Sequence, residues 1–76
     1  MTITGYEIEY IRTGSGETKK TNKVIIWEND DYEFEHGIEI AHNIIEVIEL
    51  FEIIAAKYWG TYETKHAIIN IRKIER

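Results

Sequence analysis

The sequence contains no cysteine and no proline. The lack of cysteine excludes disulfides and thiolate metal ligands, and the lack of proline excludes proline-rich linkers and cis-proline turns. Long apolar runs are also missing. The run from Ile53 to Ala56 is as long as any in the chain, whereas a helix that crosses a bilayer needs about 20 apolar residues. A chain of 76 residues without these devices must be held together by a small apolar core.

Arrangements of residues that would indicate catalysis are lacking as well. The Gly-Ser-Gly segment at residues 14–16 has the wrong spacing for a phosphate-binding loop, and no helix pattern follows it. No nucleophile has a favoured setting, so neither a Ser–His–Asp nor a Cys–His set can be assembled. Glu39 and His42 form a Glu-x-x-His pair, but a metal site needs further ligands from other elements. We therefore predict that the protein is not an enzyme and holds no metal or cofactor.

The charge of the chain is unbalanced. It has 14 acidic and 9 basic residues, a formal net charge of −5, and 43% hydrophobic residues, which is a globular composition. An acidic protein is poorly suited to contact nucleic acid directly, because binding to phosphates requires cations. The N-terminal residues lack the basic region and apolar run of a signal peptide. We expect a single domain over residues 1–76, located in the cytoplasm and not associated with membranes.

Hydrophobic periodicity predicts four strands and one helix. Alternating apolar and polar residues are typical of strands, and they occur over residues 2–12, 32–36 and 62–75. Residues 23–28 also predict a strand, but residues 24–27 are apolar on both faces, which suits a strand that is covered on both sides or whose second face meets a partner. After Gly37 the apolar repeat changes to three- and four-residue spacing, which predicts a long helix over residues 38–59 that ends at Gly60.

These elements predict an α+β fold in which one helix packs on one face of an antiparallel sheet. With four strands the order of elements is β-β-β-α-β and the strand order is 3-2-1-4, with the last strand beside the first. If residues 32–36 form a loop instead, the element order is β-β-α-β and the strand order is 2-1-3. In both cases one helix leaves the other sheet face open, which favours self-association.

The acidic residues are segregated from the basic ones. No Lys or Arg occurs between Lys23 and Lys57, and such segregation produces a directed field that steers a partner of opposite charge. Ile53 interrupts the polar face of the predicted helix, and Trp59 lies at its end, so both are candidate apolar anchors. The predicted partner-binding residues are Asp30, Asp31, Glu33, Glu35, Glu39, Glu46, Glu49, Ile53 and Trp59.

A small acidic domain with a sheet, one helix and no catalytic set resembles the inhibitors that bacteriophages encode against host enzymes, such as the anti-CRISPR proteins. The resemblance covers size, charge and element order and includes no shared motif. It implies a protein partner with a basic surface, such as a nuclease or another nucleic-acid-binding protein of host defence, whose Arg and Lys side chains meet carboxylates in place of phosphates. The alternative hypothesis is a structural or regulatory homodimer without catalytic activity.

Overall fold

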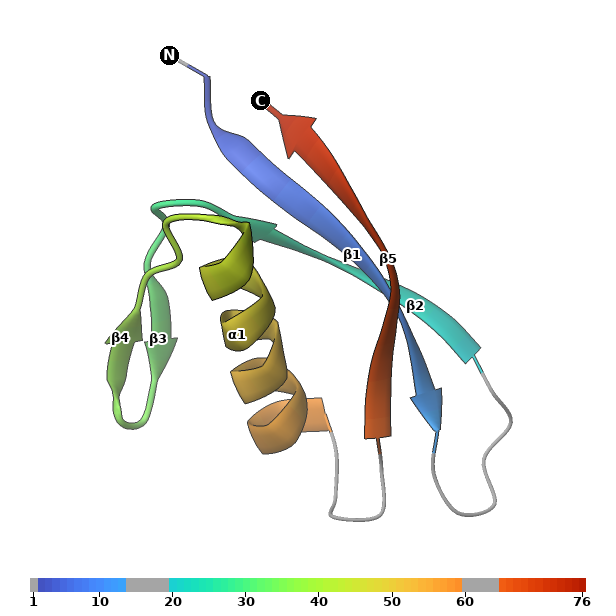
Figure 1. Ribbon diagram of the computed structural model, residues 1–76. Coiled ribbons are helices and arrows are strands. Elements are labelled where there is room, and N and C mark those ends of the chain that lie inside the picture. Colours follow the sequence, from blue (N-terminus) through green and yellow to red (C-terminus); the bar gives the residue numbers. More distant parts are fainter. Residues whose placement is uncertain (1, 14–19, 60–64) are drawn as a thin grey trace.

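The computed structural model describes residues 2–13, 20–59 and 65–76, without the side chains of residues 20, 58 and 59. It consists of a three-stranded antiparallel sheet, a two-stranded hairpin and one helix that continues into a π-helical turn (Figure 1). The α+β fold class is therefore confirmed. The elements are β1 (Thr4–Thr13), β2 (Lys20–Trp27), β3 (Tyr32–Phe34), β4 (Gly37–Glu39), α1 (Ile44–Ile54), the π-helical turn η1 (Ala55–Trp59) and β5 (Lys65–Glu75).

The sheet has the order β2-β1-β5. Strand β1 is central: Ile8 lies opposite Val24 of β2 and opposite Ile71 of β5. The register between β1 and β5 shifts between Glu9 and Tyr10, where a β-bulge or irregularity interrupts the pairing. The prediction that the last strand lies beside the first is confirmed.

The strand order 3-2-1-4 is wrong, and the order with three strands is the one found. Residues 32–34 do form a strand, but it pairs with β4 in a separate hairpin. One hydrogen bond and one backbone conformation accompany the turn of the chain away from the outer edge of β2. The backbone N–H of Trp27 donates to the Tyr32 hydroxyl oxygen at 2.8 Å, and Asn29 adopts a positive φ of 59°. A side chain thus occupies the edge position that a third strand would take.

The helix begins at Ile44 and not at residue 38. Asn43 is its N-cap, and its side-chain oxygen accepts a hydrogen bond from the backbone N–H of Glu46 at 3.0 Å. Residues 37–39 form β4 instead, with Gly37 at a φ of 136° that favours glycine. The predicted stop at Gly60 and the start of the last strand at residues 62–64 lie outside the described residues.

The core lies between α1 and one face of the sheet, so the prediction of a helix on one sheet face is confirmed. Tyr10 and Phe51 meet there, with ring centroids 5.2 Å apart and planes tilted by 59°. Tyr32 and Phe34 of the hairpin pack against the edge of this core. Its buried members come from β1, β2, α1, η1 and the segment before the helix: Tyr6, Ile8, Tyr10, Ile26, Ala41, Val47, Leu50, Phe51 and Ala55.

The opposite face of the sheet is open but is charged near its middle. Glu7 of β1 forms ion pairs with Arg72 of β5 at 3.2 Å and with Lys23 of β2 at 3.8 Å. Ile25 lies directly opposite Glu7 and is 43% exposed, and residues paired in this way share a sheet face. This face therefore mixes charged and apolar groups.

Candidate protein-binding surface

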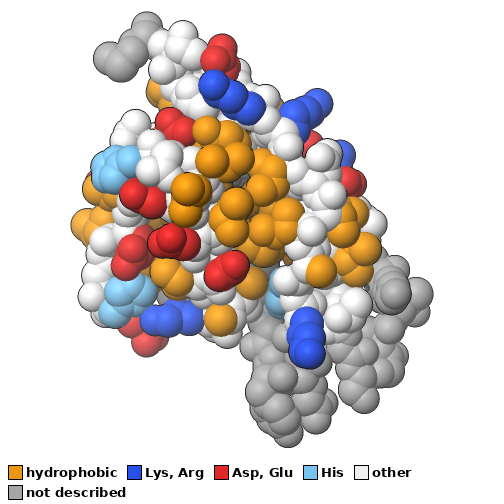
Figure 2. Space-filling view, viewed as in Figure 1, with side chains coloured by type: hydrophobic (Ala, Val, Ile, Leu, Met, Phe, Trp, Pro, Cys, Tyr) orange, Lys and Arg blue, Asp and Glu red, His pale blue; other side chains and the backbone are white. Residues whose placement is uncertain are grey.

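A shallow groove lies between the end of β4 and α1. Its volume is about 180 Å³. In Figure 1 the β3–β4 hairpin stands beside the helix, with β3 drawn between β4 and α1. Figure 2 shows acidic side chains gathered over this part of the molecule, next to apolar surface. We call it the acidic groove and define it by its lining residues Glu39, Ile40, Glu46, Glu49, Leu50 and Ile53.

Helical spacing places most of the residues that line the groove on one face of α1. Residues three and four positions apart share one helix face, so Glu46, Glu49 and Ile53 line the groove from α1. Leu50 belongs to the same face and is only 3% exposed, so it forms part of the floor. Ile53 is half-buried. The sequence offered no structural reason for an apolar residue at position 53 on the polar face of the helix. The structure gives one, because Ile53 lies in the groove beside the hairpin.

Glu39 reaches the groove from the hairpin and not from the helix. It pairs with Tyr32 across β3 and β4, and residues opposite each other in an antiparallel pair share a face. Since Tyr32 packs against the core, Glu39 lies on the side of the hairpin that faces α1. The sequence placed Glu39 with Glu46 and Glu49 on one helix. The structure brings the same three carboxylates together from two elements.

Glu46 has a structural role in addition to its charge. One of its carboxylate oxygens accepts a hydrogen bond from the backbone N–H of His42 at 3.0 Å, while its own N–H donates to Asn43. This reciprocal arrangement satisfies N–H groups at the start of the helix that would otherwise lack partners. Substitution of Glu46 would therefore change helix stability as well as groove charge.

Glu39 is connected to a cation through a histidine ring. Nε2 of His36 lies 3.0 Å from Oε1 of Glu39, and Nδ1 of His36 lies 3.0 Å from Nζ of Lys57. An ammonium group can only donate, so Nδ1 accepts from Lys57 and Nε2 carries the proton that is donated to Glu39. Helical spacing from Glu49 and Ile53 places Lys57 at the end of this face. No sequence signal indicated that His36 would join it to Glu39.

Glu49 is the least constrained carboxylate of the groove. It is exposed, and among the described residues it has no hydrogen-bond or ion-pair partner. A carboxylate with its oxygens available can accept two parallel hydrogen bonds from an arginine side chain. Glu49 is therefore the group best placed to contact a cation on a partner.

Several predicted site residues lie away from the groove. Glu33 pairs with Ile38 and faces the outer side of the hairpin, while Glu35 lies in the exposed turn between β3 and β4. Asp30 and Asp31 lie between β2 and β3, where Asp30 lines a different cavity. The side chain of Trp59 lies outside the described residues.

The helical Glu-x-x-His pair does not exist as such. Glu39 ends β4 and His42 precedes the helix, where its Nδ1 lies 2.7 Å from the side-chain oxygen of Asn29. Within residues 2–13, 20–59 and 65–76, no three His, Cys, Asp or Glu side chains form a group that could hold a metal ion. The described helix is also too short to cross a membrane. Comparisons with protein families, with characterised proteins and with solved structures gave no match to this chain.

Proposed function

We propose that this protein is a small, non-catalytic inhibitor that binds a protein with a basic surface, such as a phage-encoded inhibitor of a host nuclease or of another nucleic-acid-binding protein of host defence. The observation that carries this proposal is the acidic groove, in which Glu39, Glu46 and Glu49 surround Leu50 and Ile53. Carboxylates next to apolar side chains suit an interface whose centre is apolar and whose rim is charged.

The two kinds of side chain make different contributions to such binding. The carboxylates attract a basic surface from a distance and raise the association rate. The exposed apolar surface of Ile40 and of half-buried Ile53 loses contact with water when the partner docks, which favours the complex. A partner that normally binds phosphates presents Arg and Lys side chains, and these can bind carboxylates through the same charge-assisted hydrogen bonds. Occupation of that basic surface would exclude nucleic acid and so inhibit the partner.

The test is capture of a partner from a bacterial lysate by the immobilised chain, followed by measurement of the affinity of the purified pair. We expect the captured protein to be eluted by salt and by heparin, a polyanion that competes for basic surfaces. Glu49→Lys should weaken binding about tenfold or more, because a like charge placed opposite a cation costs several kcal/mol. The double variant Glu39→Lys/Glu49→Lys should abolish binding.

Glu33→Lys is the matched control. It changes the net charge by the same amount as Glu49→Lys but lies on the outer side of the hairpin. Weaker binding of the Glu49 variant alone would support the acidic groove as the interface. Equal effects of the two variants would mean that only the total charge matters. An affinity that changes neither with these substitutions nor with the salt concentration would contradict the proposal.

A second candidate function is a structural or regulatory homodimer, and the position of β5 favours it. This strand has 11 residues and lies at the edge of the described sheet, where it pairs with β1 on one side. Long edge strands offer backbone groups to another chain, and Ile69 in this strand is 49% exposed. Sedimentation equilibrium at micromolar concentration should then show a dimer that Ile69→Lys dissociates. A wild-type monomer at these concentrations would exclude this function.

A further inference from the structure

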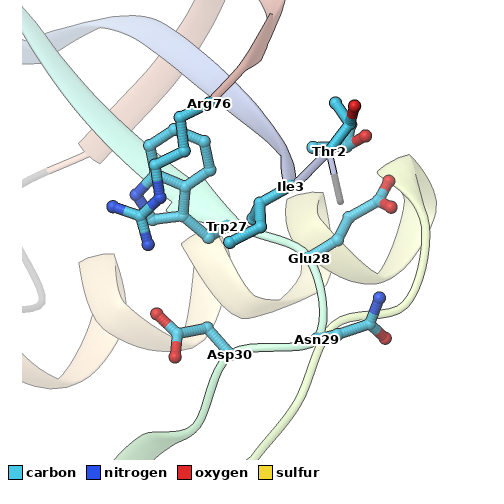
Figure 3. A pocket seen from close by; sticks show the side chains of 8 residues that line it. Thr2, Ile3, Trp27, Glu28, Asn29, Asp30 and Arg76 are labelled. Atoms are coloured by element: carbon cyan, nitrogen blue, oxygen red, sulfur yellow. The ribbon is translucent and has the colours of Figure 1, made fainter.

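A second cavity lies at the end of the sheet where β1 begins and β2 and β5 end (Figure 3). Its volume is about 230 Å³, and its lining includes the side chains of Trp27, Glu28, Asp30 and Arg76. Sites for drug-sized ligands usually have volumes of about 300–1,000 Å³. The smaller size of this cavity suits a single side chain better than a large ligand.

Trp27 forms a fixed aromatic wall of this cavity. It lies opposite Gly5 of β1, and its ring approaches the Gly5 backbone so closely that a Cβ atom added there would lie 2.4 Å from Cε3 of the indole. Glycine thus lets the ring rest against the neighbouring strand. The guanidinium carbon of Arg76 lies 4.0 Å from the centroid of the indole ring. This is a cation–π contact, and it demonstrates that the ring accepts a guanidinium group.

The Arg76 guanidinium does not pair with the carboxylates that line the cavity, Glu28 and Asp30. Within the described part of the chain, neither Glu28 nor Asp30 forms an ion pair with Arg76. Oε2 of Glu28 accepts a hydrogen bond from the Tyr6 hydroxyl at 2.8 Å, which fixes this carboxylate. In Figure 3 the Asp30 carboxylate points toward the side on which the Arg76 guanidinium lies, while Glu28 points toward Thr2. The cavity therefore offers the aromatic face of Trp27 and the carboxylate of Asp30 to one cationic group.

We propose that this cavity binds an arginine side chain of a partner protein, and that Arg76 occupies the aromatic wall until the partner displaces it. A planar guanidinium stacks on indole and forms forked hydrogen bonds with a carboxylate, which the ammonium of lysine does less well. The carboxylates disfavour a nucleotide, which could also stack on Trp27 but carries phosphates. The inference rests on the proposed function for its basic partner, but arginine binding itself can be tested without that partner.

Displacement of Arg76 requires only a side-chain movement. The backbone of Arg76 is held by two hydrogen bonds to Ile3, one in each direction, at 2.8 and 2.9 Å. These bonds keep the end of β5 in place while the guanidinium leaves the ring. Arg76 therefore acts as an internal competitor that lowers the affinity for any external arginine.

The experiment is an NMR titration of the full-length, ¹⁵N-labelled protein with Nα-acetyl-arginine amide, observed at the indole N–H of Trp27. Trp59→Phe distinguishes this signal from that of the other tryptophan. We expect Arg76→Ala to tighten binding by about threefold or more, because the competitor is gone. Asp30→Asn in that background should weaken it again by a similar factor. Glu33→Gln, an exposed carboxylate of the hairpin, should have no effect.

Three outcomes would overturn the inference. These are the absence of a Trp27 shift in Arg76→Ala at millimolar probe, an equal shift with uncharged Nα-acetyl-norleucine amide, and unchanged affinity in the Asp30 variant. The variant Glu39→Lys/Glu49→Lys should bind the arginine probe like the wild type. Arginine binding that survives in this variant would support the cavity even if the acidic groove has no partner. Loss of arginine binding there would contradict a site separate from the groove.

Discussion

Gly5 shows how one residue without a side chain determines the position of another. The Trp27 ring occupies the space that a Cβ at Gly5 would fill, and the Arg76 guanidinium lies on that ring. We expect Gly5→Ala to destabilise the protein by about 1–3 kcal/mol, the usual cost of forcing extra atoms into a packed site. Urea unfolding measures this change. In a Trp27→Val background the cost should largely disappear, and an unchanged cost there would rule out the ring as its cause.

Tyr6 carries a pH-dependent part of the stability. Its hydrogen bond to Glu28, followed by burial and by the negative charge of Glu28, raises the pKa of the Tyr6 hydroxyl above its ordinary value near 10. The unfolded chain therefore loses this proton at lower pH than the folded protein does. The resulting stabilisation is present below about pH 10 and is lost as the pH rises through and above that value.

Tyr6→Phe tests this linkage. Burial also raises the pKa of Tyr10, so the informative quantity is the difference between the wild type and the variant. Urea unfolding from pH 8 to pH 11 should show a steeper loss of stability in the wild type, because Phe has no proton to lose. Parallel pH profiles of the two proteins would show that the Tyr6 hydroxyl makes no such contribution.

At the scale of elements, the start of α1 depends on a few polar side chains. Asn43 caps the helix and Glu46 reaches back to His42. Asn43→Ala should destabilise the protein by about 1 kcal/mol, since it leaves the N–H of Glu46 without its acceptor. Thermal or urea unfolding measures the change. Asn43→Asp keeps an acceptor at the same place and should cost much less, and equal losses in both variants would contradict the cap.

The β3–β4 hairpin is the element that makes the acidic groove. Tyr32 and Phe34 hold it against the core, and Gly37 allows the backbone to turn at a φ of 136°. Without the hairpin, Glu46, Glu49 and Ile53 would form one side of an open helix face. With it, Glu39 is placed opposite them. The groove is therefore formed by the packing of the short β3–β4 hairpin beside α1.

At the scale of the whole molecule, the protein is thin, with extents of 45 × 28 × 16 Å. A single helix on a three-stranded sheet leaves much of the chain in contact with solvent. The distribution of charge on this surface therefore affects how the protein associates with charged partners. The span without Lys or Arg between Lys23 and Lys57 includes β3, β4 and α1. The fold nevertheless brings Lys57 beside this acidic region through His36.

Lys57→Gln tests whether this cation weakens the field of the groove. Under the proposed function, removal of one positive charge should raise the association rate with a basic partner by about two- to threefold at low salt. Surface plasmon resonance at 50 mM and 500 mM salt measures this, and the difference should vanish at the higher concentration. Lys73→Gln, an exposed position on β5, is the control. A slower association of the Lys57 variant would contradict this account.

The types of four elements, β1, β2, β5 and α1, and the charge pattern follow from the sequence alone, whereas residues 37–39 form β4 and not the predicted start of the helix. Period-two alternation predicted β1 and β5, and the three- and four-residue repeat predicted α1, because each period places apolar side chains on one face of its element. A short run that is apolar on both faces predicted β2. The sequence also determined that Glu39, Glu46, Glu49 and Ile53 belong to the acidic part of the chain. The helix start was predicted too early because the residues before Asn43 continue an apolar repeat that the cap interrupts.

Which distant side chains meet depends on the tertiary structure. The Tyr32 hydroxyl accepts a hydrogen bond at the edge of β2, where a fourth strand would have paired. The chain forms the separate β3–β4 hairpin instead. That hairpin placed Glu39 across from α1 and His36 beside Lys57, and the end of β5 placed Arg76 on Trp27. Periodicity reports the face on which a residue lies. The partner of that face depends on turns and packing between segments that are far apart in the sequence.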